Sequence, residues 1–514
     1  MISLALAPSL HALAYNAPFF SIFLAMTAAI VTPLLPHRDR IPERACCVVL
    51  ASIAALSTCL LLVLVHPALD GALALDDPFT YPMGHFPAPW GNELRAGPLE
   101  ALLALAFSVS MLFSLTGNAG STAKDVPPAR RALLCVLMEL IMGSLLAMIY
   151  TNDLFTAYVF IEVCTIAAPA IVAAKEEGQT IRAALRYLVM SLAGSGLILM
   201  SIATLYALTG HLLMQPMGMA VQGLLQTGRY ALPLVTSLYL MTLGLTIKSA
   251  LYPFAFWLPD AHGSATSAAS AVLSGLVLKG HIFLIVKVFY RVFGTEAVHM
   301  LRMDDGLMIL GVLSMIAGSL HALRQRDVKR MIAWSSVAQM GYIFLGIGLG
   351  TTAGLAAACL HIIVHAMIKP MLFTAAEGLA MSSGGRKELH ALRGSFYRDR
   401  WAGAGLIVGA CSMMGIPSFA GFASKLNLML AAFESPYVAW ALAALAASSV
   451  LNALYYVPVV IAILTPAAEA RYEPHAPTPI YRGTMVAFVT MNFFLGLFCV
   501  PLLHLIERGA ELLK

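Results

Sequence analysis

Charged residues are scarce in this sequence. Only 11% of the 514 residues are Asp, Glu, Lys or Arg, whereas 60% are hydrophobic. Soluble domains contain about 25% charged residues, so the composition excludes an ordinary soluble protein. The apolar runs are continuous and do not alternate with polar residues, which excludes a transmembrane β-barrel. We therefore expect an all-α polytopic membrane protein, because a helix satisfies its own backbone hydrogen bonds in lipid.

Several kinds of functional site have no motif in the sequence. The eight cysteines include no C-x-x-C pair, as an iron–sulfur or zinc site would often require. Phosphate-binding loops, dinucleotide-binding glycine motifs and nucleophile elbows are also absent. The first residues lack the basic segment of a cleavable signal peptide. We expect no cofactor, no metal and no nucleic-acid partner, so the driving force has to come from an ion gradient or a partner protein.

About fourteen segments are long and apolar enough to cross the bilayer as helices of roughly 20 residues. Two of them contain a predicted break, because proline interrupts the hydrogen bonds of a helix. The seventh span, near 231–258, breaks around Pro253, and the twelfth, near 402–434, breaks around Pro417. A polar stretch, residues 67–98, separates the second span from the third.

The broken spans are five helices apart, which predicts two five-helix units of inverted topology. Many transporters use such repeats, with discontinuous helices at the ion site. The expected organisation is an N-terminal part with helices 1–3, a first repeat with helices 4–8, a second repeat with helices 9–13, and a C-terminal helix 14, at residues 1–130, 131–292, 303–465 and 466–514.

Lysines and arginines are unevenly distributed among the predicted loops. If the N-terminus is outside, 20 of the 31 lie in inside loops, six lie outside, and five lysines fall within spans. Inside loops of membrane proteins carry the excess of basic residues. We therefore expect a multi-pass protein of the inner or plasma membrane with both termini outside.

The segment from Thr246 to Lys287 holds three of the lysines within spans: Lys248, Lys279 and Lys287. A lysine at the centre of a transmembrane helix costs roughly 2.5–3.5 kcal/mol on insertion scales. Lys248 precedes the predicted break and Lys279 is central in span eight, so both are expected to titrate or to pair with an acid. Lys287 is two turns later and is expected to reach the membrane interface, as long basic side chains often do.

Three titratable residues recur at every fourth position in span eleven: His361, His365 and Lys369. This spacing places them on one face of a helix. A proton relay, structural hydrogen bonding or a metal site would each fit. We favour the relay, because imidazole exchanges protons near neutral pH and no third metal ligand is evident.

Two further residues are expected to act with these: Glu162, near the middle of span five, and Lys425, which follows the second break as Lys248 precedes the first. Burial disfavours the charged forms of carboxylates and amines, so proton exchange between such groups becomes accessible. A structural, hydrogen-bonded acid is the alternative for Glu162. Weaker candidates are Glu139, Glu377 and His262, the last of which would gate entry from the inside or cap a helix.

Four motifs resemble those of the antiporter-like subunits, which are the proton-translocating subunits of respiratory complex I, Mrp-type antiporters and energy-converting hydrogenases. In chain order they are YPFAFWLPDAH followed by SAASAVLSGLVLK, DVKRMIAWSSVAQMGYI, HIIVHAMIKPMLFTAAEG and MMGIPSFAGFASK. With Glu162, the resemblance covers roughly residues 130–430. It implies fourteen helices with two inverted repeats, in agreement with the span count.

The resemblance also implies roles for the titratable residues. Glu162 and Lys248 would form the pair of spans five and seven, and Lys279 would be the central lysine of span eight. The residues of span eleven would form the connecting polar axis, which ends at Lys425. We expect a subunit that moves H⁺, with Na⁺ as an alternative, and that has complex I-like, hydrogenase-like or Mrp-like membrane partners.

Electron transfer in partner subunits would drive the transport, so the chain would be part of a translocase without a redox centre of its own. The alternatives are an Mrp-type antiporter subunit and a stand-alone secondary antiporter. A subunit is expected to co-purify with partners, whereas a stand-alone antiporter works when purified alone.

Overall fold

The computed structural model describes residues 2–36, 40–65, 78–86, 91–466 and 477–513. Parts of the predicted polar stretch 67–98 and of the C-terminal part 466–514 lie outside these residues. The elements up to the seventh span are α1 (Ile2–Val31), η1 (Thr32–Leu34), α2 (Ile41–Val65), β1 (Phe79–Pro82), η3 (Met83–His85), β2 (Glu93–Ala96), α3 (Pro98–Gly117), α4 (Ala119–Asp125), α5 (Pro128–Tyr150), α6 (Leu154–Ala173), α7 (Gly178–Thr209), α8 (Met214–Gln226), α9 (Ala231–Lys248) and α10 (Trp257–Ser264).

The second part of the chain continues in the same helical manner. Its elements are α11 (Ser267–Val272), η4 (Leu273–Val277), α12 (Leu278–Lys287), η5 (Val288–Phe293), α13 (Thr295–Met300), α14 (Met303–Leu323), α15 (Val328–Gly348), α16 (Thr352–Met381), α17 (Ser395–Arg398), α18 (Arg400–Met414), α19 (Ala420–Ala432), α20 (Val438–Leu464), α21 (Pro479–Leu497) and α22 (Cys499–Glu511). The only sheet among the described residues is the hairpin of β1 and β2, with Phe79 opposite Ala96.

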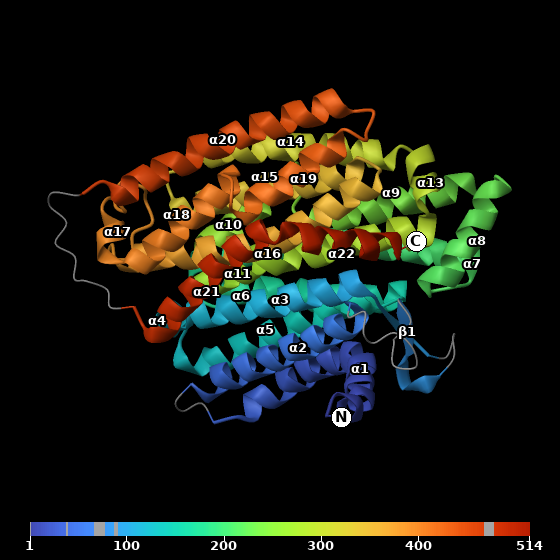
Figure 1. Cartoon of the computed structure of the whole chain (residues 1–514), viewed down its shortest axis with the longest axis horizontal. Coiled ribbons are helices and arrows are strands. Elements are labelled where there is room, and N and C mark those ends of the chain that lie inside the picture. Colours follow the sequence, from blue (N-terminus) through green and yellow to red (C-terminus); the bar gives the residue numbers. More distant parts are fainter. Residues whose placement is uncertain (1, 37–39, 66–77, 87–90, 467–476, 514) are drawn as a thin grey trace.

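Thirteen helices of the described chain are long and apolar enough to cross a membrane. The predicted twelfth span is not one of them, because it is divided into α18 and α19, of 15 and 13 residues. Counted as one broken span, this pair completes the predicted fourteen. The helices lie roughly parallel to one another along the long axis of the molecule (Figure 1). The prediction of a polytopic all-α membrane fold is confirmed.

Both predicted breaks are present. The seventh span breaks directly after Lys248, where α9 ends, and the helical structure resumes at Trp257. The twelfth breaks where Gly415, with φ of 90°, caps α18. That conformation is open to glycine at little steric cost. The last span, predicted as one helix near 483–506, is divided at Phe498 into α21 and α22.

The eighth span contains two π-helical turns, η4 before α12 and η5 after it. A π turn holds one residue more than an α turn and leaves carbonyl groups without their usual partners. The sequence pattern predicted a continuous helix here and missed both turns.

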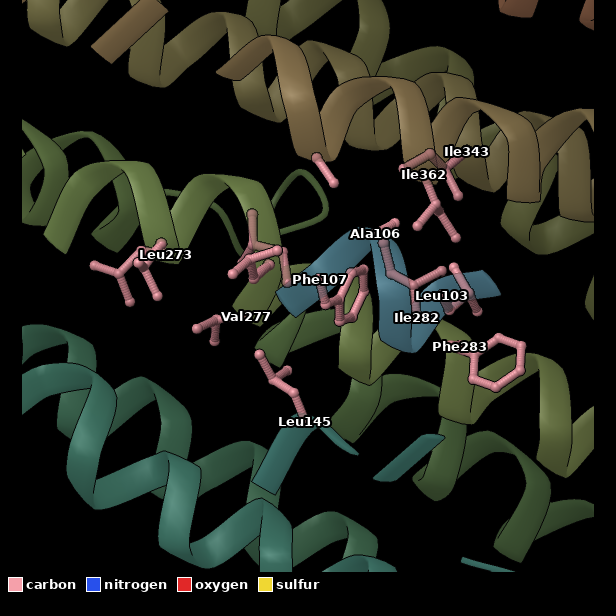
Figure 2. Packing of buried hydrophobic residues seen from close by; sticks show 14 of the residues in the cluster. Leu103, Ala106, Phe107, Leu145, Leu273, Val277, Ile282, Phe283, Ile343 and Ile362 are labelled. Carbon is pink, nitrogen blue, oxygen red and sulfur yellow. The ribbon is translucent and has the colours of Figure 1, made fainter. Parts of the chain in front are cut away.

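The core lies around three fully buried helical segments: α11 to η5, α15 and α16. A buried helix that carries polar side chains needs other helices around it to shield these groups from lipid. α16 runs through the middle of the molecule, and α3, α15, α18 and α19 lie around it (Figure 1). Side chains from α3, α5 and the eighth span meet in this core, including Phe107, Leu145 and Ile282 (Figure 2).

The loops rich in basic residues meet at one end of the molecule, which we call the basic end. Lys175, after α6, pairs with Asp125 at the end of α4 at 2.6 Å, and Arg130 pairs with Glu176 at 3.1 Å. α4 and α17 lie at this end, whereas α8, α13 and the hairpin lie at the opposite end (Figure 1).

Candidate functional site: a buried chain of titratable residues

Lys248 is held by hydroxyl groups. Its side chain is 2% exposed, and Nζ donates to Thr165 Oγ1 of α6 at 2.7 Å and to Ser191 Oγ of α7 at 2.9 Å. A buried ammonium needs such partners, since it has lost its water. The close approach of α9 to α7 depends on Gly194, where a Cβ would lie 2.9 Å from the Gly244 carbonyl oxygen.

Glu162 lies on α6, one turn before Thr165. It forms no ion pair with Lys248 within 4.0 Å in the described chain, and its Oε1 is buried without a hydrogen-bond partner. The two residues therefore do not form a direct ion pair in this conformation, and their functional pairing stays a prediction. The hydroxyl of Thr165 lies one turn further along α6 than Glu162, and it accepts the hydrogen bond from Lys248 Nζ instead of the carboxylate. Glu162 still interacts with Lys248 electrostatically.

The break beside Lys248 is stabilised by a neighbouring helix. Ala250 has φ of 51°, and the Tyr252 amide donates to Ser314 Oγ of α14 at 3.3 Å. An amide that leaves a helical ladder inside a membrane needs a replacement acceptor. Lys248 therefore lies at the last turn of a helix, beside a break that α14 stabilises.

Lys279 is fully buried and depends on the first π turn. Its Nζ donates to the carbonyl oxygen of Ser274, which lies in η4. The Ser274 hydroxyl is 2.7 Å from the Ser336 hydroxyl of α15. The π turn thus supplies the acceptor that allows an ammonium group at the centre of the protein.

The three residues of span eleven lie on α16 as predicted and are at most 1% exposed. The rings of His361 and His365 are 6.1 Å apart. His361 bonds Ser424 through Nδ1 at 3.0 Å and Gln339 through Nε2 at 3.1 Å. Both ring nitrogens of His365 are buried without a hydrogen-bond partner, and both Lys279 and Lys369 interact with this ring electrostatically.

Lys369 Nζ donates to the carbonyl oxygen of Ile332 at 2.9 Å and to the hydroxyl of Ser335. Both acceptors belong to α15. The hydroxyl of Ser335 in turn lies 2.9 Å from Tyr456 Oη of α20. This lysine therefore connects the row on α16 to a second layer of hydroxyl groups.

Lys425 occupies the second break. Its Nζ donates to the carbonyl oxygens of Met413 at 2.6 Å and Met414 at 3.4 Å, which are free because α18 ends there. It also lies 4.9 Å from the ring centre of Tyr342, a cation–π distance. The ring of Tyr342 also stacks on the ring of His361, with ring centroids 5.5 Å apart. Tyr342 therefore links the row on α16 to Lys425.

Lys287 was expected to reach the membrane interface, but its side chain stays inside the protein. The side chain is fully buried, and Nζ donates to the carbonyl oxygens of Ile149 at 3.0 Å, Met148 at 3.3 Å and Thr151. These carbonyls lie at the C-terminal end of α5, where no amide of the helix donates to them and where the helix dipole favours a positive charge. Lys287 is thus a helix cap supplied by another helix.

The weaker candidates have separate locations. Glu139 of α5 accepts from the Thr32 hydroxyl at 3.1 and 2.9 Å, away from the row on α16. His262 is buried in α10 and stacks on Phe373 of α16, and Glu377 accepts from the Ser267 hydroxyl. No group of three or more metal-ligating side chains occurs in the described ranges.

Sequence reasoning missed the neutral groups that connect the charged ones. Ser336, Gln339 and Tyr342 all lie on α15, in the motif that carries the family resemblance. Their spacing of three residues marks one helix face, so this signal was available. Ser424 of α19 had no such signal, because its partner His361 lies on another helix.

Comparison with known proteins identifies the family. The transmembrane family described as NADH:quinone oxidoreductase/Mrp antiporter matches residues 151–451, more than half of the chain. The chain belongs to this family. It is an antiporter-like membrane subunit, as the resemblance implied.

Two curated relatives represent different branches of the family. NADH-quinone oxidoreductase subunit N of Desulforudis audaxviator is 34% identical over 397 residues, which cover 76% of this chain and 77% of that protein. A subunit of the Na(+)/H(+) antiporter of Alkalihalophilus pseudofirmus is 32% identical over 285 residues, which cover 55% of this chain and 56% of that protein.

Solved structures show the same fold. A chain of the membrane-bound sulfane sulfur reductase, an archaeal respiratory membrane complex, has a TM-score of 0.84 at 24% identity and coverage of 98% and 97%. A chain of the Mrp complex from Dietzia sp. has a TM-score of 0.83 at 20% identity, with 97% of both chains covered. All these relatives are subunits of larger assemblies by name.

Proposed function

We propose that this antiporter-like subunit translocates protons through the buried chain of titratable residues. Protons pass between Lys279 and Lys425 by way of His365 and His361, and Lys369 adjusts the charge beside His365. Lys248 and Glu162 act as the control element of the first unit. The two broken helices place Lys248 and Lys425 in comparable positions, which supports the two inverted repeats of residues 131–292 and 303–465.

One observation carries this proposal. The two ring nitrogens of His365 are buried and have no partner among the described residues, between two lysines that interact with the ring. A histidine kept only for structure would have its buried nitrogens hydrogen-bonded, since each orphaned group costs roughly 1–3 kcal/mol. An imidazole without a fixed protein partner can take up a proton and release it near neutral pH, as a relay residue does.

The driving force is assigned to partner subunits. We infer that electron transfer in a quinone reductase-like or hydrogenase-like partner changes the electrostatic interaction between Lys248 and Glu162, and with it the protonation of Lys248. The likeness to a subunit of an Na(+)/H(+) antiporter favours a second candidate, exchange of H⁺ for Na⁺ in an Mrp-like assembly. In both cases both termini lie outside and the basic end faces inside, as the distribution of basic residues favours.

Proteoliposomes with the complete purified complex test the proposal. Proton uptake is followed with a pH-sensitive dye while the driving reaction of the complex is measured in parallel. Lys279→Met, Lys248→Ala and Glu162→Gln are each expected to lower the number of protons moved per turnover. Transport at the wild-type ratio in all three variants would show that the buried chain does not carry the protons. Adding Na⁺ to one side separates the two candidate functions.

A further inference from the structure

The row of titratable residues on α16 extends beyond Lys369 with one interruption. Positions 361, 365 and 369 are followed at the same spacing by Phe373 and then Glu377. Four residues of α-helix rise about 6 Å, so Glu377 lies two turns, roughly 12 Å, from Lys369 along the helix axis. A phenyl ring cannot carry a proton, and the row alone therefore ends at Lys369.

His262 covers this interruption from another helix. Its ring stacks on Phe373 with centroids 5.1 Å apart and planes 30° apart. The side chain is fully buried, and neither ring nitrogen has a hydrogen-bond partner among the described residues. Lys279, Lys329 and Lys369 all interact with the ring electrostatically. His262 thus places free imidazole nitrogens beside the one apolar position of the row.

Glu377, the last position of this spacing on α16, lines a small cavity that several polar residues also line. The cavity has a volume of about 50 Å³, and its lining includes Asn118, Ser121, Thr374 and Tyr481 as well as Glu377. One water needs about 10–15 Å³ measured in this way, so the space admits a few water molecules. The lining residue Ser121 belongs to α4, which lies at the basic end (Figure 1).

A short turn at residues 265–267 is bonded both to Glu377 of α16 and to Lys329 of α15. Ser267 Oγ donates to Glu377 Oε2 at 2.5 Å, and Lys329 Nζ donates to the Ala265 carbonyl oxygen at 2.6 Å. This turn joins α10, which carries His262, to α11, which leads to Lys279. The fold therefore fixes Glu377, His262 and the path to Lys279 relative to one another.

We propose that Glu377 and His262 form a proton-loading branch that leads from the cavity at the basic end to Lys279 and Lys369. A hydronium ion in the cavity transfers its proton to the Glu377 carboxylate and is left as a water molecule. The Glu377 O–H bond then breaks as a water-bridged N–H bond forms on His262, and His262 passes the proton to a neutral lysine. Glu377 returns to the carboxylate and His262 to the neutral ring, so the branch is ready for the next proton. The inference rests on the proposed function.

The same proteoliposome assay, with the whole complex, tests the branch. Glu377→Gln keeps an acceptor for Ser267 but cannot release a proton, and proton uptake is expected to fall by about tenfold or more, as when a positioned acid–base group is lost. Glu377→Asp restores the carboxylate and is expected to recover much of the rate. Glu388→Gln changes an exposed carboxylate of the loop after α16 and is the matched control.

His262→Gln is the second variant, located on a different helix, and it decides the matter if Glu377→Gln fails to assemble. It is expected to lower uptake to the same extent. Wild-type uptake in an assembled Glu377→Gln or His262→Gln complex overturns the branch. If Lys279→Met abolishes uptake in the same preparation, the proposed function survives that result. If Lys279→Met also leaves uptake unchanged, the proposed function fails as well.

Discussion

The hydroxyl groups around Lys248 allow a quantitative prediction. Thr165→Val removes the acceptor of the 2.7 Å bond from Nζ and keeps the shape of the side chain. Ser191 Oγ at 2.9 Å remains as the second acceptor, so the lysine is not left without a partner. The variant therefore changes the energy of the ammonium form without removing the titratable group.

The magnitude follows from the type of bond. A hydrogen bond to a charged group contributes roughly 1.5–3 kcal/mol, and about 1.4 kcal/mol corresponds to a factor of ten in an equilibrium. We expect Thr165→Val to weaken protonation of Lys248 by about tenfold to a hundredfold on this basis. If the charge on Lys248 controls the second unit, proton uptake per turnover falls, whereas assembly of the complex does not change.

The assay compares this variant with Thr204→Val on α7. Thr204 donates to the Met200 carbonyl oxygen of its own helix at 2.8 Å and touches none of the buried lysines by hydrogen bond. Uptake in Thr204→Val is expected to match the wild type. The reasoning is refuted if the double variant Thr165→Val, Ser191→Ala assembles and moves protons at the wild-type ratio, since Lys248 would then have lost both acceptors without effect.

Two further predictions concern stability. Lys287→Met leaves three carbonyls at the end of α5 without their donor and is expected to destabilise the complex by roughly 3 kcal/mol or more, while the proton ratio of the folded fraction stays unchanged; thermal melting combined with the uptake assay checks both, and an unchanged melting temperature would contradict the cap. Gly311→Ala places a Cβ 2.7 Å from the Leu345 amide nitrogen and is expected to separate α14 from α15 at a cost of about 1–3 kcal/mol. Gly306→Ala on the same helix meets nothing within 4 Å and is its control, so equal melting temperatures for the two variants would count against the close contact.

Features that depend on order along the chain could be predicted from the sequence. The spans, the breaks near Lys248 and Lys425, and the shared face of His361, His365 and Lys369 all follow from hydrophobicity, proline and helical spacing. Contacts between helices could not be predicted, because each residue turns a helix by about 100° and one sequence does not fix the relative rotation of two helices. This is why Lys248 was expected to meet Glu162 and instead meets Thr165.

The same limit explains Lys287 and α8. The position of Lys287 near a span end predicted an interfacial side chain, but the carbonyls that it binds belong to α5, more than 130 positions earlier in the chain. α8 is a short amphipathic helix between two spans, and its polar face concealed it from a search for apolar segments. For Lys287 the missing information was tertiary, whereas α8 has a sequence pattern that a search for apolar spans does not detect.

The π turn of η4 makes the number of residues in this span as important as their identity. Membrane helices normally accept changes in length only in their loops. Deleting one residue between Leu273 and Val277 would convert the π turn to an α turn, which holds one residue fewer, so the helix that follows would keep its orientation. The carbonyl oxygen of Ser274 would then return to the regular hydrogen-bond ladder of the helix and be lost to Lys279. An evolutionary lineage could therefore change the environment of this lysine by a three-nucleotide deletion that removes no charge.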